Sequence, residues 1–171
     1  MDKAYIGSIN VKVKTPDFNF KNREMLRAFK RKMRIAHTEA LGESREILKR
    51  HIRDVDAVDT GKLLNSVASK LFVKNDEIFQ GTVHFNAPGK EYAHFVDKGR
   101  GKGFMPPKAK FTAWAKRHGI NNPRLIFYLR LRIAKRGTKG KKFMAPATRE
   151  INRSYNKIIN TAVNEFRRSI K

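Results

Sequence analysis

The sequence NREMLRAFKRKMRIAHTEALGESREILKRHI, residues 22–52, decides most of the expected fold. Its apolar residues recur at intervals of three and four, which places them on one side of an α-helix. They are Leu26, Phe29, Met33, Ala36, Ala40, Ile47, Leu48 and Ile52. The pattern predicts a helix of about 30 residues, longer than the usual globular helix, that packs one side against the rest of the protein.

Shorter patterns around this helix predict an α+β fold. Alternating residues indicate a strand over 4–14 and a β-hairpin built from strands 67–73 and 78–85. A last long helix is expected to begin near Pro146, because proline is favoured in a first helical turn. We therefore expect a small antiparallel sheet packed by long N- and C-terminal helices.

Further short elements complete this outline. The sequence predicts short helices over residues 90–97, 111–118 and 123–135. Asp59 or Thr60 is expected to cap a short turn that turns Leu63 and Leu64 inward. The last helix is expected to bury one stripe, namely Ala147, Ile151, Tyr155, Ile158, Ala162 and Phe166.

Length and composition favour one domain that does not enter a membrane. A chain of 171 residues suits a single domain, 1–171, in which residues 100–142 form an inserted basic segment of loops and helices. No apolar run approaches the ~18 residues that a spanning helix needs. The start of the chain lacks the apolar core of a secretory signal. The chain has no cysteine, which excludes disulfides and thiolate metal sites.

The charge pattern predicts a polyanionic partner. The formal net charge is +24, and no acidic residue occurs between Asp97 and Glu150. A field of one sign is costly in self-repulsion unless a polyanion faces it. The aromatic residues do not interleave with the basic ones as on a single-strand stacking surface, so we expect contacts to phosphates. The expected nucleic-acid-facing residues are Lys98, Arg100, Lys102, Arg130, Arg132, Lys135, Arg136, Lys139, Lys141 and Lys142.

Two glycine-rich stretches, GRGKG at 99–103 and GTKGK at 137–141, lie within this segment. Neither has the spacing of a nucleotide-binding loop. We expect two flexible basic loops that contact DNA phosphates through their cations and backbone N–H groups. Either loop taken alone is better explained as a solvated basic loop without a ligand, whereas the two loops together with Arg130, Arg132, Lys135 and Arg136 favour phosphate contacts.

The motifs that suggest an enzyme are incomplete. Asp59-Thr60-Gly61 is the tripeptide of aspartic proteases, but that chemistry needs two carboxylates sharing a proton. Here it is expected to be a helix stop and cap. The stretch from His118 to Asn122 resembles part of an HNH nuclease, without the second histidine or the acids that hold a metal. We expect no catalysis, no metal and no cofactor.

Three segments, in this order, resemble the tail-completion or head–tail joining protein family of long-tailed bacteriophages. The segment VDTGKLLNSV, 58–67, contributes the motif residues Asp59, Thr60, Gly61, Leu63 and Ser66. The segment EYAHFVDKG, 91–99, contributes Tyr92, Ala93, Phe95 and Gly99, with Asp97 where the family has glutamate. The segment FMAPA, 143–147, contributes Phe143, Pro146 and Ala147.

The resemblance implies a non-enzymatic virion protein of the phage neck or tail top. Such a protein is assembled in the host cytoplasm, completes the tail and joins it to the DNA-filled head. It forms a homo-oligomeric ring around the phage DNA, between connector or neck proteins and tail-tube or tail-terminator proteins. Tyr92, Phe95 and Phe104 are candidates for contacts within the ring.

Two alternatives remain open from the sequence. The positive charge could face an acidic neighbouring ring in place of DNA. The chain could also be a free, sequence-independent DNA-binding protein, such as a packaging accessory or a nucleoid-type factor. The second alternative rests on net charge alone.

Overall fold

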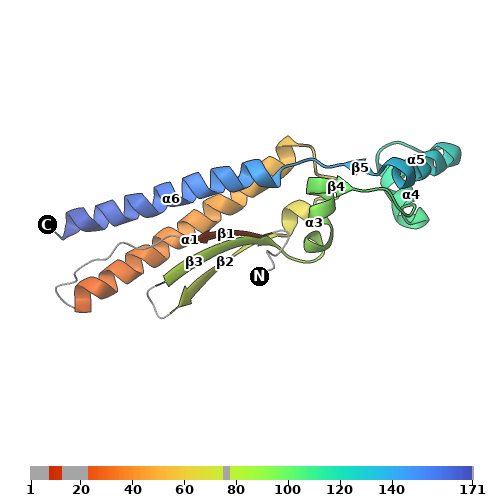
Figure 1. Cartoon of the computed structure of the whole chain (residues 1–171). Helices are drawn as coiled ribbons and strands as arrows, with labels where there is room; N and C mark the ends of the chain where they lie inside the picture. The colour runs from red at the N-terminus through yellow and green to blue at the C-terminus, as the bar shows by residue number, and fades with distance from the viewer. Residues whose placement is uncertain (1–7, 13–22, 75–77, 171) are drawn as a thin grey trace. The chain divides into compact units, whose positions relative to one another are not determined.

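The computed structural model describes residues 8–12, 23–74 and 78–170, and it confirms the α+β fold (Figure 1). The elements are β1 (Ser8–Lys12), α1 (Arg23–Asp54), α2 (Lys62–Asn65), β2 (Val67–Lys74), β3 (Ile78–Phe85), α3 (Gly89–Lys98), β4 (Gly99–Arg100), α4 (Lys108–Arg117), α5 (Pro123–Arg136), β5 (Thr138–Lys139) and α6 (Met144–Ser169). The chain divides into two compact units. Unit 1 comprises the residues up to His94 and from Lys142 onward, and unit 2 comprises Phe95–Lys141. The expectation of a single domain with an insertion stays a prediction.

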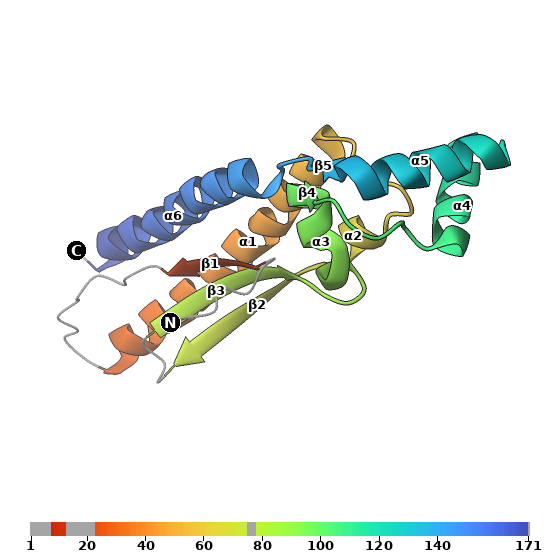
Figure 2. The ribbon, with the colours of Figure 1, turned by 45° about the vertical axis from the view of Figure 1, so that its right-hand side comes forward.

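Unit 1 is a three-stranded sheet covered by the two long helices. The strands lie in the order β1-β3-β2 and are antiparallel, so that Val83 of β3 pairs with Ile9 on one side and Ser69 on the other. Helix α1 lies along the sheet, and α6 runs beside α1 (Figure 2). The predicted strand over 4–14 appears as β1, and its remaining residues lie outside the described part of the chain.

The core of unit 1 lies along α1. The predicted stripe from Phe29 to Ile52 is buried, and it also takes in His37 and Ser44. The Ser44 hydroxyl donates to the carbonyl of Ala40 at 2.6 Å, which satisfies its buried polar group within the helix.

The stripe of α6 differs from the prediction at one position. Ile159 is 1 % exposed, whereas the predicted Ile158 is only half-buried. The reason is helical spacing, because Ile159 follows the buried Tyr155 by four residues and Val163 follows by four more. The rest of the predicted stripe is buried, from Ala147 to Phe166.

The N-cap of α2 lies one or two residues later than predicted. The N-cap residue is Gly61, with φ of +73°, in place of Asp59 or Thr60. A left-handed conformation is open to glycine at little cost, so the backbone turn itself starts the helix. At the other end the Ser66 hydroxyl donates to the carbonyl of Leu63 at 2.7 Å.

In unit 2 the two predicted flexible loops are paired. Strands β4 and β5 form an antiparallel ladder that matches Gly99 with Lys139 and Arg100 with Thr138. A Cβ atom added at Gly137 would lie 2.0 Å from the carbonyl oxygen of Arg100. The glycines therefore allow two backbones to approach closely, which is a different role from chain flexibility.

The rest of unit 2 is helical. Helices α4 and α5 pack on one another, and Ala115 and Ile126 are their buried residues. Asn122 caps α5 by accepting from the N–H of Arg124 at 2.9 Å, and Pro123 follows it in the first turn. Among the described residues, no helix is both long and apolar enough to cross a bilayer.

Candidate nucleic-acid interface

In unit 1 the first sequence motif packs against the segment that leads into the second one. A Cβ atom at Gly89, the first residue of α3, would lie 1.8 Å from the Ser66 hydroxyl oxygen, so these backbones are in close contact. The N–H of Asn86 donates to the carbonyl of Ser66 at 2.8 Å. Burial and, second, the negative charge of Asp59 raise the pKa of Tyr92. Ser66 of the first motif therefore packs on the short segment before the second motif, and the charge of Asp59 acts on Tyr92.

The third motif joins unit 1 through buried side chains. Phe143 is fully buried and meets Phe85, the last residue of β3, edge to face with ring centroids 6.3 Å apart. Ala147 is also fully buried, and Pro146 is half-buried. The third motif therefore anchors the start of α6 where the hairpin ends.

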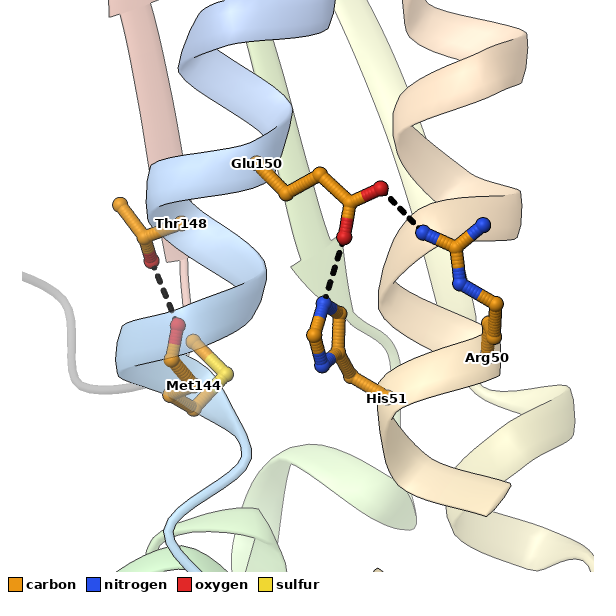
Figure 3. A network of polar contacts seen from close by, with 5 residues as sticks. All are labelled: Arg50, His51, Met144, Thr148 and Glu150. Carbon is orange, nitrogen blue, oxygen red and sulfur yellow. Dashed lines mark hydrogen bonds and ion pairs between the residues drawn. The ribbon is translucent and has the colours of Figure 1, made fainter. Parts of the chain in front are cut away.

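A polar network fixes the same end of α6 to α1 (Figure 3). The Glu150 carboxylate accepts from Arg50 and, at 2.8 Å, from His51. These hydrogen bonds, that of Arg50 foremost, hold the pKa of Glu150 below its usual range. The Thr148 hydroxyl donates to the carbonyl of Met144 at 2.8 Å. The acid that ends the acid-free stretch is thus engaged in holding two helices together.

The predicted ring-contact residues differ in exposure. Phe95 is exposed, and Phe104 is 90 % exposed, whereas Tyr92 is half-buried. Ala93 of the same motif is buried, and Gly99 adopts φ of +86° at the start of β4. Phe95 and Phe104 are therefore the two that are available to another molecule.

Most of the predicted nucleic-acid-facing residues are exposed. In unit 2 the exposed ones are Lys98, Lys102, Arg132, Lys135, Arg136, Lys139 and Lys141, and Lys142 is exposed at the start of the returning part of unit 1. The Lys98 ammonium lies 3.4 Å from the buried carboxylate of Asp97, the one acidic residue of unit 2. Exposed cations of one sign attract a polyanion without reading its sequence.

Arg100 and Arg130 are placed differently, because both are half-buried and hold a loop. The Arg100 guanidinium donates to the carbonyl of Phe104 at 2.6 Å. The Arg130 Nε donates to the carbonyl of Pro106 at 2.9 Å. Both arginines thus position residues 101–107, between β4 and α4, with part of their hydrogen-bonding capacity.

The β4–β5 ladder brings the two basic stretches together. Besides the paired strands, the N–H of Lys141 donates to the carbonyl of Val96 at 2.8 Å. The N–H of Arg100 donates to the Thr138 hydroxyl at 3.1 Å. The basic residues of 98–102 and of 135–141 therefore belong to one continuous surface of unit 2.

One side of α5 combines an exposed aromatic residue with cations. Arg124, Tyr128 and Arg132 recur every four residues, so they share one side of the helix, and Tyr128 is 65 % exposed. This side of α5 thus carries one aromatic ring between two cations, and the expectation of contacts to phosphates stays a prediction. These three residues are found by taking every fourth residue of α5, whereas they are not neighbours in the sequence.

Comparisons of this chain with known protein families, with curated proteins and with solved structures find no match. Among the described residues, no group of three or more His, Asp or Glu side chains is arranged to hold a metal ion. The geometry of unit 2 suits electrostatic contact with a polyanion, and the motif residues of unit 1 serve packing and backbone conformation.

Proposed function

We propose that this protein is a non-enzymatic structural protein of the phage neck or tail top. It completes the tail and joins it to the DNA-filled head, as a homo-oligomeric ring around the DNA channel. The observation that carries the proposal is the packing, in unit 1, of the first and third motifs and of the segment that leads into the second motif. Ser66 packs on Gly89, Asp59 acts on Tyr92, and Phe143 packs on the hairpin that links them.

The charge of unit 2 supports the DNA channel. Its cations are exposed and have the same sign, which suits a surface that holds the phosphate backbone without sequence preference. The exposed rings of Phe95 and Phe104 are suited to contacts with neighbouring subunits, since aromatic residues are enriched at such interfaces. The neighbours are connector or neck proteins on one side and tail-tube or tail-terminator proteins on the other.

Electron microscopy of lysates from a phage that lacks this gene tests the proposal. Separate DNA-filled heads and full-length tails are expected, because each part assembles and only the joining step fails. Joined particles that are empty or non-infectious would contradict the joining role and favour a role in DNA handling.

Complementation of this phage tests the motif. Gly61→Val is expected to block joining, because a β-branched residue is strongly disfavoured at φ of +73°. Gly42→Ala is the matched control, since a Cβ atom there has no neighbour within 4 Å. Full complementation by a stable Gly61→Val protein would show that the motif is dispensable.

A free, sequence-independent DNA-binding protein is the second candidate, and the exposed cations of unit 2 favour it. Such a protein binds duplex DNA tightly in solution as a monomer, with affinity that falls steeply with salt. A ring subunit binds free DNA weakly, because its charges act together only around a channel. The affinity of the isolated subunit for duplex DNA separates the two candidates.

A further inference from the structure

A second group of cations lies in unit 1, on the first half of α1. Arg27, Lys30, Arg31 and Arg34 line an open recess together with Phe79 of β3. They follow the spacing i, i+3, i+4 and i+7, so they share one side of the helix over about 10 Å of its length. This surface, the α1 cation stripe, is separate in sequence from the basic residues of unit 2.

The α1 cation stripe contrasts with three other cations of its helix, which are paired. The Lys32 ammonium lies 2.9 Å from Glu165, the Lys49 ammonium lies 2.9 Å from Glu46, and Arg50 pairs with Glu150. Within the described part of the chain, no member of the stripe makes an ion pair. Like charges at helical spacing repel one another, so the stripe costs stability that an anion would restore.

The acidic residues of α1 lie mainly elsewhere. Glu39 and Glu43 line a different recess, together with residues of α6 that include Glu165. Glu24 is the acidic residue in the first turn of α1, and it does not line the recess of the stripe. The recess lined by Glu39 and Glu43 is therefore mainly acidic, whereas the recess at the α1 cation stripe is cationic.

The apolar part of the recess is a fixed surface. Phe79 is 3 % exposed, and its ring stacks on His37 with centroids 4.8 Å apart. A ring so well buried offers little surface for base stacking. Recognition at this recess therefore depends on the cationic groups around Phe79.

Three of the four cations are arginines, whose planar guanidinium groups bind phosphate oxygens in pairs. An extended row of such groups fits a regular series of phosphates better than a single compact anion. We propose that the α1 cation stripe binds the phosphodiester backbone of nucleic acid, as a contact of unit 1 additional to that of unit 2. This inference does not depend on the proposed place of the protein in the phage particle.

Fluorescence anisotropy with a labelled duplex of about 20 base pairs tests it, over roughly 50 to 200 mM salt. The variant R27Q/K30Q/R31Q/R34Q of the full chain removes the stripe. The control R45Q/R153Q/K157Q/R168Q removes the same charge from exposed helix positions outside the stripe. Urea unfolding of both variants checks that each is folded.

The stripe variant is expected to reduce the slope of log affinity against log salt by up to about 3.6, since each of the four lost phosphate contacts contributes about 0.9. The control is expected to change the slope by less than half as much. Equal effects of the two variants would show that net charge alone matters and would overturn the proposal.

A second arm distinguishes phosphate from carboxylate chemistry. The wild-type chain is expected to bind poly-glutamate of matched charge more weakly than it binds the duplex. Removal of the stripe is expected to change the affinity for poly-glutamate little. If removal of the stripe weakens poly-glutamate binding as much as DNA binding, the assignment to the phosphodiester backbone is wrong. An acidic protein segment would then be the ligand.

Discussion

The Nδ1 atom of His37 lies 2.7 Å from the phenol oxygen of Tyr155, and this hydrogen bond joins α1 to α6 inside the core of unit 1. Both side chains are fully buried. Burial lowers the pKa of His37 to about 4 and raises the pKa of Tyr155 to about 12. The pair is therefore neutral through the physiological range, which suits its place between the two longest helices.

We expect the free energy of unfolding to fall as the pH is lowered from about 6.5 to about 4. In this window the unfolded chain binds a proton at His37 and the folded chain does not, so acid favours the unfolded state. The full shift corresponds to about 3 kcal/mol. Urea unfolding measured across this range checks the prediction.

His37→Gln is the control for this prediction, because glutamine can hydrogen-bond to Tyr155 and does not titrate. The lowered pKa values of Glu46, Glu150 and Glu165 affect both proteins alike, so the difference between the two profiles isolates His37. Identical pH profiles for the two proteins would contradict the prediction.

Gly89→Ala is expected to destabilise unit 1 by about 1–3 kcal/mol, the usual cost of overpacking. The new methyl group would collide with Ser66, whose hydroxyl oxygen and Cβ would lie 1.8 and 2.5 Å from it. Thermal unfolding measures the loss. In the double variant Gly89→Ala/Ser66→Gly the loss of stability should be smaller than the sum of the losses in the two single variants. If the two losses simply add, the collision is not the cause.

Gly137→Ala is expected to open the β4–β5 ladder. The substitution places a Cβ atom 2.0 Å from a backbone oxygen, at a residue with φ of +74°, where a side chain costs about 1–2 kcal/mol in addition. Hydrogen exchange at the N–H groups of Arg100 and Lys141 should accelerate. Gly101→Ala has open space around its Cβ atom and should leave this exchange slow.

Reversal of the exposed cations Arg132, Lys135 and Arg136 to glutamate is expected to impair DNA retention or particle assembly more than folding. Arg130 is left intact, because its hydrogen bond to Pro106 would confound the result. Phage yield and thermal unfolding of the variant are the two measurements. An unchanged phage yield would contradict this prediction. Reversal of Arg45, Arg153 and Arg168 to glutamate is the control for the change in net charge.

The sequence predicted the long elements well, because burial follows a regular period in each. The stripe of α1 and the hairpin β2–β3 lie where the periodicity placed them. The short ladder could not be found in this way, since strands of two residues have no period and Gly99 pairs with Lys139 across a long separation. The cap of α2 depends on the φ of Gly61, which no side-chain pattern reveals.

Only part of the candidate interface could be predicted from the sequence. Composition pointed to the basic segment, and most of its cations are exposed, because a charged side chain is costly to bury. It could not show that Arg100 and Arg130 are drawn to carbonyl groups of a nearby loop, since that depends on where the chain folds back. Composition could not separate the α1 cation stripe from the paired cations of the same helix, because Glu165 and Glu150, the partners of Lys32 and Arg50, come from α6.

The hydrogen bond from Lys141 to Val96 joins residues at the two ends of unit 2, and the β4–β5 ladder continues the closure inward. The two ends of unit 2 are therefore held side by side by its own backbone. A change in the length of the loop between β4 and α4 would leave these two ends together, because none of the bonds that close them comes from that loop.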